Sequence, residues 1–351
     1  MIAGLIEKLI RLEDLTADEA AAALGEVMEG RATPAALAAL LAALVMKGER
    51  PAELVGFART MRAHAVRLSA PAGEVFDTCG TGGDRSGTFN ISSAAAIVVA
   101  ACGVKVAKHG NRSVSSRCGS ADVFEQLGVN VSATPAVVER TLHDANIAFF
   151  FAPTFHPSMK HAGQTRRDLG IRTTFNLLGP LTNPAGASRQ VVGVPKPELT
   201  GLLARALNLL GSTRAWVVHG ADGIDEISTT GHTKVSEVRG GAVNTFYIHP
   251  AEFGVRKASP AELQGGDAAE NAAIIRAILD GRPGAPRDIV LLNAGAGLFV
   301  AGRADTVRDG IAQAGKAIDS GAARQTLARM VSGSNAAADG ASNPATGTGI
   351  A

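Results

Sequence analysis

The sequence predicts an α/β protein in which a small helical domain precedes a larger domain with a central parallel or mixed sheet. Residues 2–70 carry apolar residues at helical spacing and show no strand pattern. From Glu74 onward, short apolar strand patterns alternate with helical patterns, which is typical of strands linked by right-handed crossovers. The length of 351 residues gives room for two domains.

Three helix start signals organise the amino-terminal region. Thr16 and Glu19 have the spacing of a capping box, and the apolar run A-A-A-A-L follows them. Thr33 is expected to cap the next helix, with Pro34 in its first turn, and Pro51 opens the third. The apolar stripes of these helices fit packing within the domain and packing against a second subunit equally well.

Strand and helix patterns then alternate along the rest of the chain. Strands are expected at 75–76, 104–107, 129–131, 147–151, 190–194, 215–219, 233–238 and 242–248, and the last two are expected to form a hairpin. Segment 147–151 is apolar on both faces, which predicts a central position in the sheet. Residues 332–351 have almost no apolar bulk, so we expect a disordered tail.

Composition excludes several classes of protein. A net charge of +2 and an aromatic content of 4% argue against a nucleic-acid or membrane partner. The three cysteines, Cys79, Cys102 and Cys118, form no C-x-x-C pair, which predicts a reducing compartment without disulfides or structural zinc. No apolar run approaches the ~20 residues that span a bilayer. There is no signal-peptide layout, and we therefore expect a cytoplasmic protein.

The stretch from Asp77 to Ser120 carries the strongest functional signal. It opens with D-T-C-G-T-G-G-D, whose glycines allow positive φ and let a ligand approach the backbone. Asn90, Ser92 and Ser93 then stand where a helix begins, and free N–H groups and the helix dipole make such a start an anion site.

A second donor-rich loop follows the next expected strand. It reads K-H-G-N-R-S-V-S-S from Lys108 to Ser116 and adds two cations and several hydroxyl donors. The spacing is neither that of a P-loop nor that of a dinucleotide fingerprint. Two such loops so close together predict a ligand that carries phosphates.

Other polar residues suit catalysis or substrate binding, each with a structural alternative. Asp222, Asp225 and Glu226 follow a strand on the expected ligand edge and suit Mg²⁺, although such a turn alone is more often a solvated surface loop. His109 and His156 fit either acid–base groups or loop supports.

Two arginines and an amide are candidates for the acceptor substrate. Either Arg166 or Arg167 is placed to bind a carboxylate, while the other is expected to be solvated. Asn111 both donates and accepts hydrogen bonds, which suits an amine or a ring substituent.

Together, five motifs resemble the anthranilate phosphoribosyltransferase family over roughly residues 1 to 330. They are G-T-G-G-D at 80–84, N-I-S-S at 90–93, K-H-G-N-R-S-V-S-S at 108–116, G-P-L-T-N-P at 179–184 and D-E at 225–226. The resemblance implies a nucleoside phosphorylase-like phosphoribosyltransferase fold. It also implies a homodimer formed through the helical domain, and transfer of phosphoribose from 5-phosphoribosyl 1-pyrophosphate to the amine of anthranilate with Mg²⁺, in tryptophan biosynthesis.

The resemblance also implies domain bounds. Residues 1–72 would form the helical domain, joined by about 170–190. Residues 73–331 would form the α/β domain that binds 5-phosphoribosyl 1-pyrophosphate, and 332–351 the tail. Two rival families remain at this point. A pyrimidine nucleoside phosphorylase would share the fold, but its phosphate-loop pattern is absent, and a nucleic-acid-binding relative would need a basic surface stripe.

Carried over position by position, the resemblance implies site residues. Contacts with 5-phosphoribosyl 1-pyrophosphate would come from Gly80, Gly83, Asp84, Thr88, Asn90, Ile91, Ser92, Ser93, Lys108, His109, Gly110, Asn111, Arg112, Ser113, Val114, Ser115, Ser116 and Ser120. Anthranilate would contact Gly80, Asn111 and Arg166; Mg²⁺ would be held by Ser92, Asp225 and Glu226; and Lys108, Asp225 and Glu226 would be catalytic. Ser93 stands where the family often has threonine, and the hydroxyl is kept.

Overall fold

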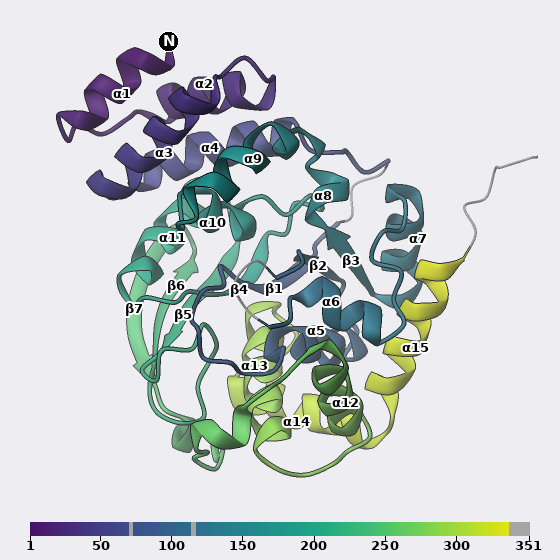
Figure 1. The fold of residues 1–351 in the computed structure, drawn as a ribbon. Helices are drawn as coiled ribbons and strands as arrows, with labels where there is room; N and C mark the ends of the chain where they lie inside the picture. The colour runs from purple at the N-terminus through teal and green to yellow at the C-terminus, as the bar shows by residue number, and fades with distance from the viewer. Residues whose placement is uncertain (70–72, 114–116, 337–351) are drawn as a thin grey trace, which may run out of the picture.

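A computed structural model describes residues 1–69, 73–113 and 117–336 (Figure 1). The chain begins with the helices α1 (Ile2–Ile10), α2 (Ala17–Met28), α3 (Pro34–Lys47) and α4 (Pro51–Ala63), and no strand lies among residues 1–69. The predicted capping box is confirmed, because Glu19 N donates to Thr16 Oγ1 and Thr16 N donates to Glu19 Oε2. Thr33 caps α3 by accepting from Ala36 N at 3.2 Å.

Helices from later in the sequence pack against this amino-terminal layer. α9 (Lys160–Leu169) contacts α2 and α3, α10 (Phe175–Leu178) contacts α4, and α11 (Glu198–Leu209) contacts α4 and the sheet. Figure 1 shows α9 and α10 between α1–α4 and the sheet. One apolar cluster runs through this junction, from Leu40 and Leu54 in the helices to Val192 and Val217 in the sheet. The helical layer is thus held on the sheet by a continuous core.

The sheet has seven strands in the order β3-β2-β1-β4-β5-β6-β7. The first five strands in this order are parallel to one another. β6 is antiparallel to β5, and β7 is antiparallel to β6. The bounds are β1 Phe76–Gly80, β2 Val106–Gly110, β3 Ile147–Phe151, β4 Arg189–Gly193, β5 Arg214–Gly220, β6 Thr233–Arg239 and β7 Ala242–Ile248. The predicted mixed sheet and its terminal hairpin are therefore confirmed.

Helices cover the face of the sheet that lies opposite the helical layer. They are α5 (Ile91–Ala101), α6 (Ser120–Gln126), α12 (Ala268–Leu279), α13 (Ala285–Val300), α14 (Val307–Asp319) and α15 (Ala322–Asn335). α5 and α13 pack on each other over Phe76, Val191 and Trp216 of the strands. At the β3 edge, α7 (Pro135–Ala145) packs on β3 and α15, and α8 (Ala152–Phe155) follows β3 directly.

Some sequence predictions of the elements are wrong. Residues 129–131 form no strand, because they lie in turns between α6 and α7 with Val129 and Val131 buried. β3 is an edge strand rather than a central one, and it is apolar on both faces because α7, α8 and α15 cover it. β2 begins and ends later than predicted, so Lys108 lies inside the strand.

The carboxyl-terminal helix extends beyond the predicted start of the tail at residue 332. α15 continues to Asn335, and Ser334 is buried. Ser334 Oγ accepts from Asn130 N at 3.1 Å, and Asn335 Nδ2 donates to Gly128 O at 2.9 Å. Residues 337–351 lie outside the described residues. Across the described part of the chain, no helix combines the length and apolarity needed to cross a bilayer.

Candidate active site

Glycines at the carboxyl ends of the strands let two loops and a turn come together. A Cβ on Gly193 would lie 1.6 Å from the carbonyl oxygen of Asp225, and a Cβ on Gly80 would lie 2.3 Å from Asp225 Oδ2. On β2, a Cβ on Gly110 would lie 2.2 Å from Ser120 Oγ. A side chain at Gly80 or Gly110 would displace the neighbouring side chain, and one at Gly193 would collide with the backbone of the turn. The turn after β5 therefore lies directly across the ends of β1 and β4.

That turn presents two carboxyl groups to backbone donors. Asp225 Oδ2 accepts from Gly82 N at 3.1 Å, and Glu226 Oε1 accepts from Ser92 N at 3.0 Å in the first turn of α5. Burial, followed by the charge of Asp84, raises the pKa of Asp225 to about 7. Burial, followed by the charge of Asp225, raises the pKa of Glu226 well above its usual range. Ionising both carboxyls at once is therefore unfavourable unless a cation binds beside them.

The donor set around this turn fits Mg²⁺. Asp225 and Glu226 supply hard oxygen ligands, and the hydroxyl-bearing Ser92 is already hydrogen-bonded to Glu226 through its backbone. Within the described ranges, no three His, Cys, Asp or Glu side chains are placed to hold a metal by themselves. Mg²⁺ is commonly held by one or two carboxylates together with substrate phosphates and water.

Lys108 places a cation beneath the same site. Its side chain is buried in β2. Burial raises the pKa of both Asp77 and Glu226, and the positive charge of Lys108 opposes this rise. Asp77 is fully buried and accepts from Asn183 Nδ2 at 2.8 Å and from His109 N at 3.3 Å. Among the described residues, the Lys108 ammonium has no hydrogen-bond or ion-pair partner. It is thus fixed near two carboxyls with its donors free for an anion.

The first glycine loop is held by an arginine that follows α9. Gly82 and Gly83 have φ of +65° and +83°, so the loop adopts a conformation that side chains rarely allow. Arg172 donates to Thr81 O at 3.0 Å, and a Cβ on Gly83 would lie 2.0 Å from its Nη1. Burial lowers the pKa of Arg172, and the charges of Asp225 and then Asp84 oppose this shift. Arg172 therefore adds a cation beside the acidic turn.

The start of α5 is tied to its surroundings by an amide network. The N-cap residue Asn90 accepts through Oδ1 from Asn271 Nδ2 at 3.0 Å and from Cys118 Sγ at 3.3 Å. Ser93 is fully buried, and its hydroxyl has no partner within the described ranges. The first turn of α5 is thus fixed with N–H groups directed at the acidic turn.

The second donor loop is described only in part. Val114, Ser115 and Ser116 lie outside the described residues. Arg112, at the end of the described segment, binds Glu125 through two N–H···O bonds of 2.6 Å and Asp122 through one of 2.9 Å. Ser113 N also donates to Asp122 Oδ2, at 3.2 Å. In this structure, α6 carboxylates therefore hold the Arg112 side chain that was expected to bind phosphate.

The two candidate arginines on α9 differ clearly. Arg166 is half-buried, its guanidinium carbon lies 5.1 Å from the ring centroid of Phe175, and burial lowers its pKa. No described residue gives it a hydrogen bond or an ion pair. Arg167 is exposed and donates to Gln164 Oε1 at 2.7 Å. Arg166 is therefore the one suited to bind a substrate carboxylate.

His109 and His156 form a buried pair of neutral imidazoles. Their ring centroids are 5.3 Å apart, and His109 Nδ1 lies 3.1 Å from Gly179 O. Burial lowers the pKa of His109 to about 3 and that of His156 to about 4. The Nε2 atoms of both rings lack a partner within the described residues. Neither ring is therefore in the cationic form that acts as a general acid at neutral pH.

Comparison with known proteins agrees with this architecture. Residues 72–324 match the glycosyl transferase family, a/b domain, and residues 3–65 match the glycosyl transferase family, helical bundle domain. A curated relative from Moorella thermoacetica, named anthranilate phosphoribosyltransferase, is 52% identical over 331 residues, covering 94% of this chain and 98% of the relative. One from Rhodospirillum rubrum, of the same name, is 52% identical over 330 residues, covering 94% and 95%. The chain belongs to the anthranilate phosphoribosyltransferase family.

Solved structures of family members share the fold. The anthranilate phosphoribosyltransferase of Thermus thermophilus superposes with a TM-score of 0.88 at 43% identity, covering 94% of this chain and 99% of that one. The enzyme of Saccharomyces cerevisiae in complex with PRPP and Mg gives a TM-score of 0.85 at 27% identity, covering 95% and 97%. The fold that the resemblance implied, a small helical domain plus a large α/β domain, is confirmed.

Sequence reasoning missed three residues around the site of this anthranilate phosphoribosyltransferase family member. Asp77 lies beneath Lys108, Arg172 holds the first loop, and Asn293 of α13 holds the acidic turn. A polar amide inside the apolar run L-L-N-A-G-A-G was an available signal for Asn293. Nothing local to Arg172 points to a loop 91 residues earlier.

Two polar groups near the site are occupied within their own loops. Asp222 Oδ2 accepts from Ser228 Oγ at 2.9 Å, so this carboxylate stabilises its own turn. The Thr88 hydroxyl lies 3.1 Å from that of Ser86 in the first glycine loop. Of the three acids in the turn, the structure thus directs Asp225 and Glu226 to the site.

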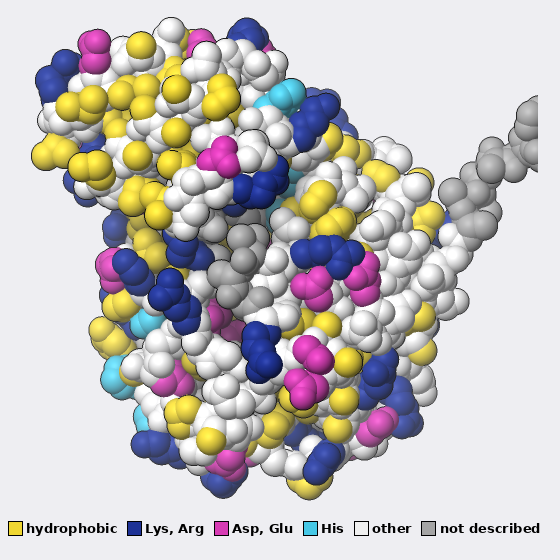
Figure 2. All heavy atoms as spheres, viewed as in Figure 1, with side chains coloured by type: hydrophobic (Ala, Val, Ile, Leu, Met, Phe, Trp, Pro, Cys, Tyr) yellow, Lys and Arg dark blue, Asp and Glu magenta, His cyan; other side chains and the backbone are white. Residues whose placement is uncertain are grey.

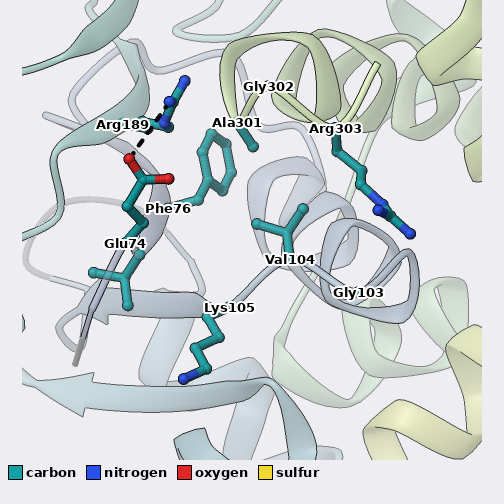
Figure 3. A pocket seen from close by; sticks show the side chains of 10 residues that line it. Glu74, Phe76, Gly103, Val104, Lys105, Arg189, Ala301, Gly302 and Arg303 are labelled. Atoms are coloured by element: carbon teal, nitrogen blue, oxygen red, sulfur yellow. Dashed lines mark ion pairs between the residues drawn. The ribbon is translucent and has the colours of Figure 1, made fainter.

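A cavity of about 220 Å³ lies at the opposite, amino-terminal edge of the strands, between β1, β4 and the ends of α5 and α13 (Figure 3). Its cationic side chains serve nearby groups: Arg189 pairs with Glu74 at 3.6 Å, and Arg303 Nε donates to Cys102 O at 3.0 Å. In Figure 3, Lys105, Arg189 and Arg303 diverge from one another. The cavity is separate from the acidic turn and provides no convergent binding site.

Proposed function

We propose that this enzyme transfers phosphoribose from 5-phosphoribosyl 1-pyrophosphate to the amino group of anthranilate, giving N-(5-phosphoribosyl)anthranilate and pyrophosphate. The main support is the cluster at the carboxyl ends of the strands. It contains Lys108 with free donors, the fixed N-terminus of α5, and an acidic turn that lies across the ends of β1 and β4 and contacts the first glycine loop. Relatives that are 52% identical to this chain are named anthranilate phosphoribosyltransferase. The reaction would serve tryptophan biosynthesis in the cytoplasm.

The phosphoribosyl substrate would bind along the two loops and the start of α5. Its contacts would be Gly80, Gly83, Asp84, Thr88, Asn90, Ile91, Ser92, Ser93, Lys108, His109, Gly110, Asn111, Arg112, Ser113, Val114, Ser115, Ser116 and Ser120. Lys108 and the N–H groups of α5 favour negative charge on the departing pyrophosphate. Arg112 must exchange its bonds with Asp122 and Glu125 for phosphate contacts when substrate binds.

Mg²⁺ would be held by Asp225, Glu226 and Ser92. Bound there, the ion supplies positive charge that stabilises the developing pyrophosphate. Support comes from the two carboxyls, whose pKa values are raised by burial first and by a neighbouring carboxylate second, both of which a bound cation would offset. The yeast family member has been solved with PRPP and Mg, and another structure of it contains 4-fluoroanthranilate.

Anthranilate would bind through its carboxylate to the unpaired Arg166, with Gly80 and Asn111 as further contacts. The attacking amine is neutral, so the reaction requires no strong base, and the neutral His109 and His156 fit this requirement. Positioning of the amine against the sugar carbon is then the main contribution to the rate. In this arrangement residues 73–331 would bind the sugar phosphate, and the helical domain of 1–72, joined by about 170–190, would pack above it.

The apolar surface over α1 and α3 would be the contact of a homodimer. Ile10, Leu12 and Met46 are 68%, 70% and 85% exposed, and Figure 2 shows a broad apolar area on this part of the molecule. A surface of this kind on a monomer marks an interaction site. Met46→Lys with Leu12→Lys should convert a dimer into a monomer in light scattering. A wild-type protein that is monomeric at micromolar concentration would reject the dimer.

The test of function is a fluorescence assay. Anthranilate, 5-phosphoribosyl 1-pyrophosphate and Mg²⁺ are mixed with the protein, and loss of anthranilate fluorescence is followed. Omitting the phosphoribosyl substrate provides the control. No loss of fluorescence, together with phosphorolysis of a pyrimidine nucleoside, would replace the proposed function with that of a nucleoside phosphorylase.

A further inference from the structure

The side chain of Asn293 binds both backbone groups of the residue that follows the acidic pair. On α13, its Oδ1 accepts from Ile227 N at 3.0 Å, and its Nδ2 donates to Ile227 O at 2.9 Å. The second Nδ2 hydrogen bond goes to Ile289 O, one turn earlier in α13, at 2.9 Å. Asn293 is only 4% exposed, and Ile227 only 1%. One amide thus fixes the backbone next to Glu226 from inside the core.

Asn293 completes a set of contacts that hold the acidic turn from behind. Gly193 of β4 lies against the carbonyl of Asp225, and no side chain fits between them. In front, Gly82 N and Ser92 N donate to the two carboxyls. Asn293 is the member of this set that binds through a side chain, so it can be changed without altering the strands.

Asp225 and Glu226 are adjacent in the chain, and each accepts from a different backbone donor, Gly82 N or Ser92 N. Both contacts would be lost if the backbone of the turn shifted. The double hydrogen bond to Ile227 prevents this movement, because releasing it would leave two buried backbone groups unpaired.

We propose that Asn293 is a positioning residue that presets the acidic turn for the metal. It keeps Asp225 and Glu226 in place before metal or substrate arrives, and it acts through Ile227 without touching either. The proposal rests on the proposed function in its assignment of Mg²⁺ to this turn. A purely structural Asn293 would instead affect only the stability of the fold.

The first test compares Asn293→Leu with Leu292→Ala. Leucine has the same number and branching of side-chain heavy atoms as asparagine and removes its hydrogen bonds. Leu292 is a fully buried α13 neighbour that makes no contact with the turn through a polar group. The Mg²⁺ concentration for half-maximal activity should rise about 10- to 100-fold in Asn293→Leu, as for other residues that orient metal ligands. The KM for anthranilate should stay unchanged. Leu292→Ala should lower the melting temperature and leave the Mg²⁺ requirement at the wild-type value.

The second test measures the metal without turnover. Binding of Mn²⁺ in the presence of inorganic pyrophosphate, followed by electron paramagnetic resonance, should weaken in Asn293→Leu and not in Leu292→Ala. Equal Mn²⁺ affinity in all variants would overturn the positioning role.

The third test needs no variant. In the metal-free wild-type protein, the Ile227 amide should exchange with deuterium as slowly as amides of β5, because the turn is already formed. Fast exchange that becomes slow only on adding Mn²⁺ and pyrophosphate would overturn the preset turn. A wild-type enzyme that turns over equally well in excess chelator would reject the metal assignment itself, and the positioning role with it. A normal metal requirement that Asn293→Leu leaves unaltered would reject the positioning role alone.

Discussion

Glu226 accepts a hydrogen bond from the backbone N–H of Ser92 at 3.0 Å, so the turn after β5 occupies the N-terminus of α5. The carboxylate is placed where an anionic ligand would otherwise meet the helix dipole. Because the phosphoribosyl loops and the acidic turn share this point, changes of charge at Glu226 should act on metal and phosphate together.

Asp225→Asn combined with Glu226→Gln should abolish activity at ordinary Mg²⁺ concentrations. The amides keep the size and the acceptor oxygens of the acids but lack the charge that attracts the metal. Activity should recover in part at higher Mg²⁺, since weaker sites still fill by mass action. Binding of anthranilate, measured by fluorescence, should be retained. Near-normal turnover with an unchanged Mg²⁺ profile would mean that the turn is an ordinary surface loop.

The same double variant should be more stable than the wild type in the absence of metal at pH 8. Burial raises the folded-state pKa of each acid, so the folded protein disfavours the charged forms. The contribution of Asp225 to stability is lost as pH rises from about 4 through about 7, and that of Glu226 is lost in the same direction. Allowing for partial solvent access, the amides should raise the free energy of unfolding at pH 8 by about 1–3 kcal/mol. Urea unfolding at pH 5 and pH 8 checks this. The difference in free energy of unfolding between the double variant and the wild type should be smaller at pH 5 than at pH 8. A variant less stable than wild type at both pH values would contradict it.

The histidine pair predicts the opposite dependence on pH. The folded-state pKa values of about 3 and about 4 lie below the unfolded value, so stability is lost as pH falls from about 6.5 toward 4. Near pH 5 the loss should be about 2 kcal/mol for each histidine. Between pH 6.5 and pH 4, the free energy of unfolding should therefore fall less in His156→Gln than in the wild type. His143→Gln, at an exposed position, is the control, and equal curves for wild type and His156→Gln would reject the neutral assignment.

Local motifs predicted much of the fold and of the candidate site. The capping box at Thr16 and Glu19 and the proline-led helix at Pro34 depend on neighbouring residues, and both are present in the structure. The glycine loop and the start of α5 are equally local, which is why Gly83 and Ser92 could be named from the sequence alone.

Features that depend on distant parts of the chain could not be predicted in this way. β3 is apolar on both faces, as a central strand would be, because helices from three separate segments cover it at the sheet edge. Asn293 and Arg172 act on loops that are remote in the sequence, and no period or spacing connects them. Arg112 pairs with Asp122 and Glu125, which lie on the helix after the loop, so its residue type alone did not reveal its partners in this structure.

The end of α15 makes a sharp prediction about truncation. Deleting residues 337–351 should leave the melting temperature and the activity unchanged, since the helix is complete at Asn335. Deleting 333–351 removes the bonds from Asn130 N to Ser334 and from Asn335 to Gly128 O, and should cost about 1–3 kcal/mol of unfolding free energy. Differential scanning calorimetry of both truncations checks this. Identical melting curves would show that the last turn of α15 contributes nothing.

Arg166→Ala should raise the KM for anthranilate by about 10- to 100-fold, the loss expected for one charge-assisted pair worth about 1.5–3 kcal/mol. The KM for 5-phosphoribosyl 1-pyrophosphate should change little. The reason is structural: the Arg166 guanidinium lies against Phe175 and has no partner among the described residues, so its bonding capacity is free for a carboxylate. Arg167→Ala, which removes only the exposed bond to Gln164, is the matched control and should leave both constants near wild type. Steady-state kinetics with each substrate varied in turn gives the two KM values separately. Equal effects from both substitutions would exclude Arg166 as the carboxylate ligand.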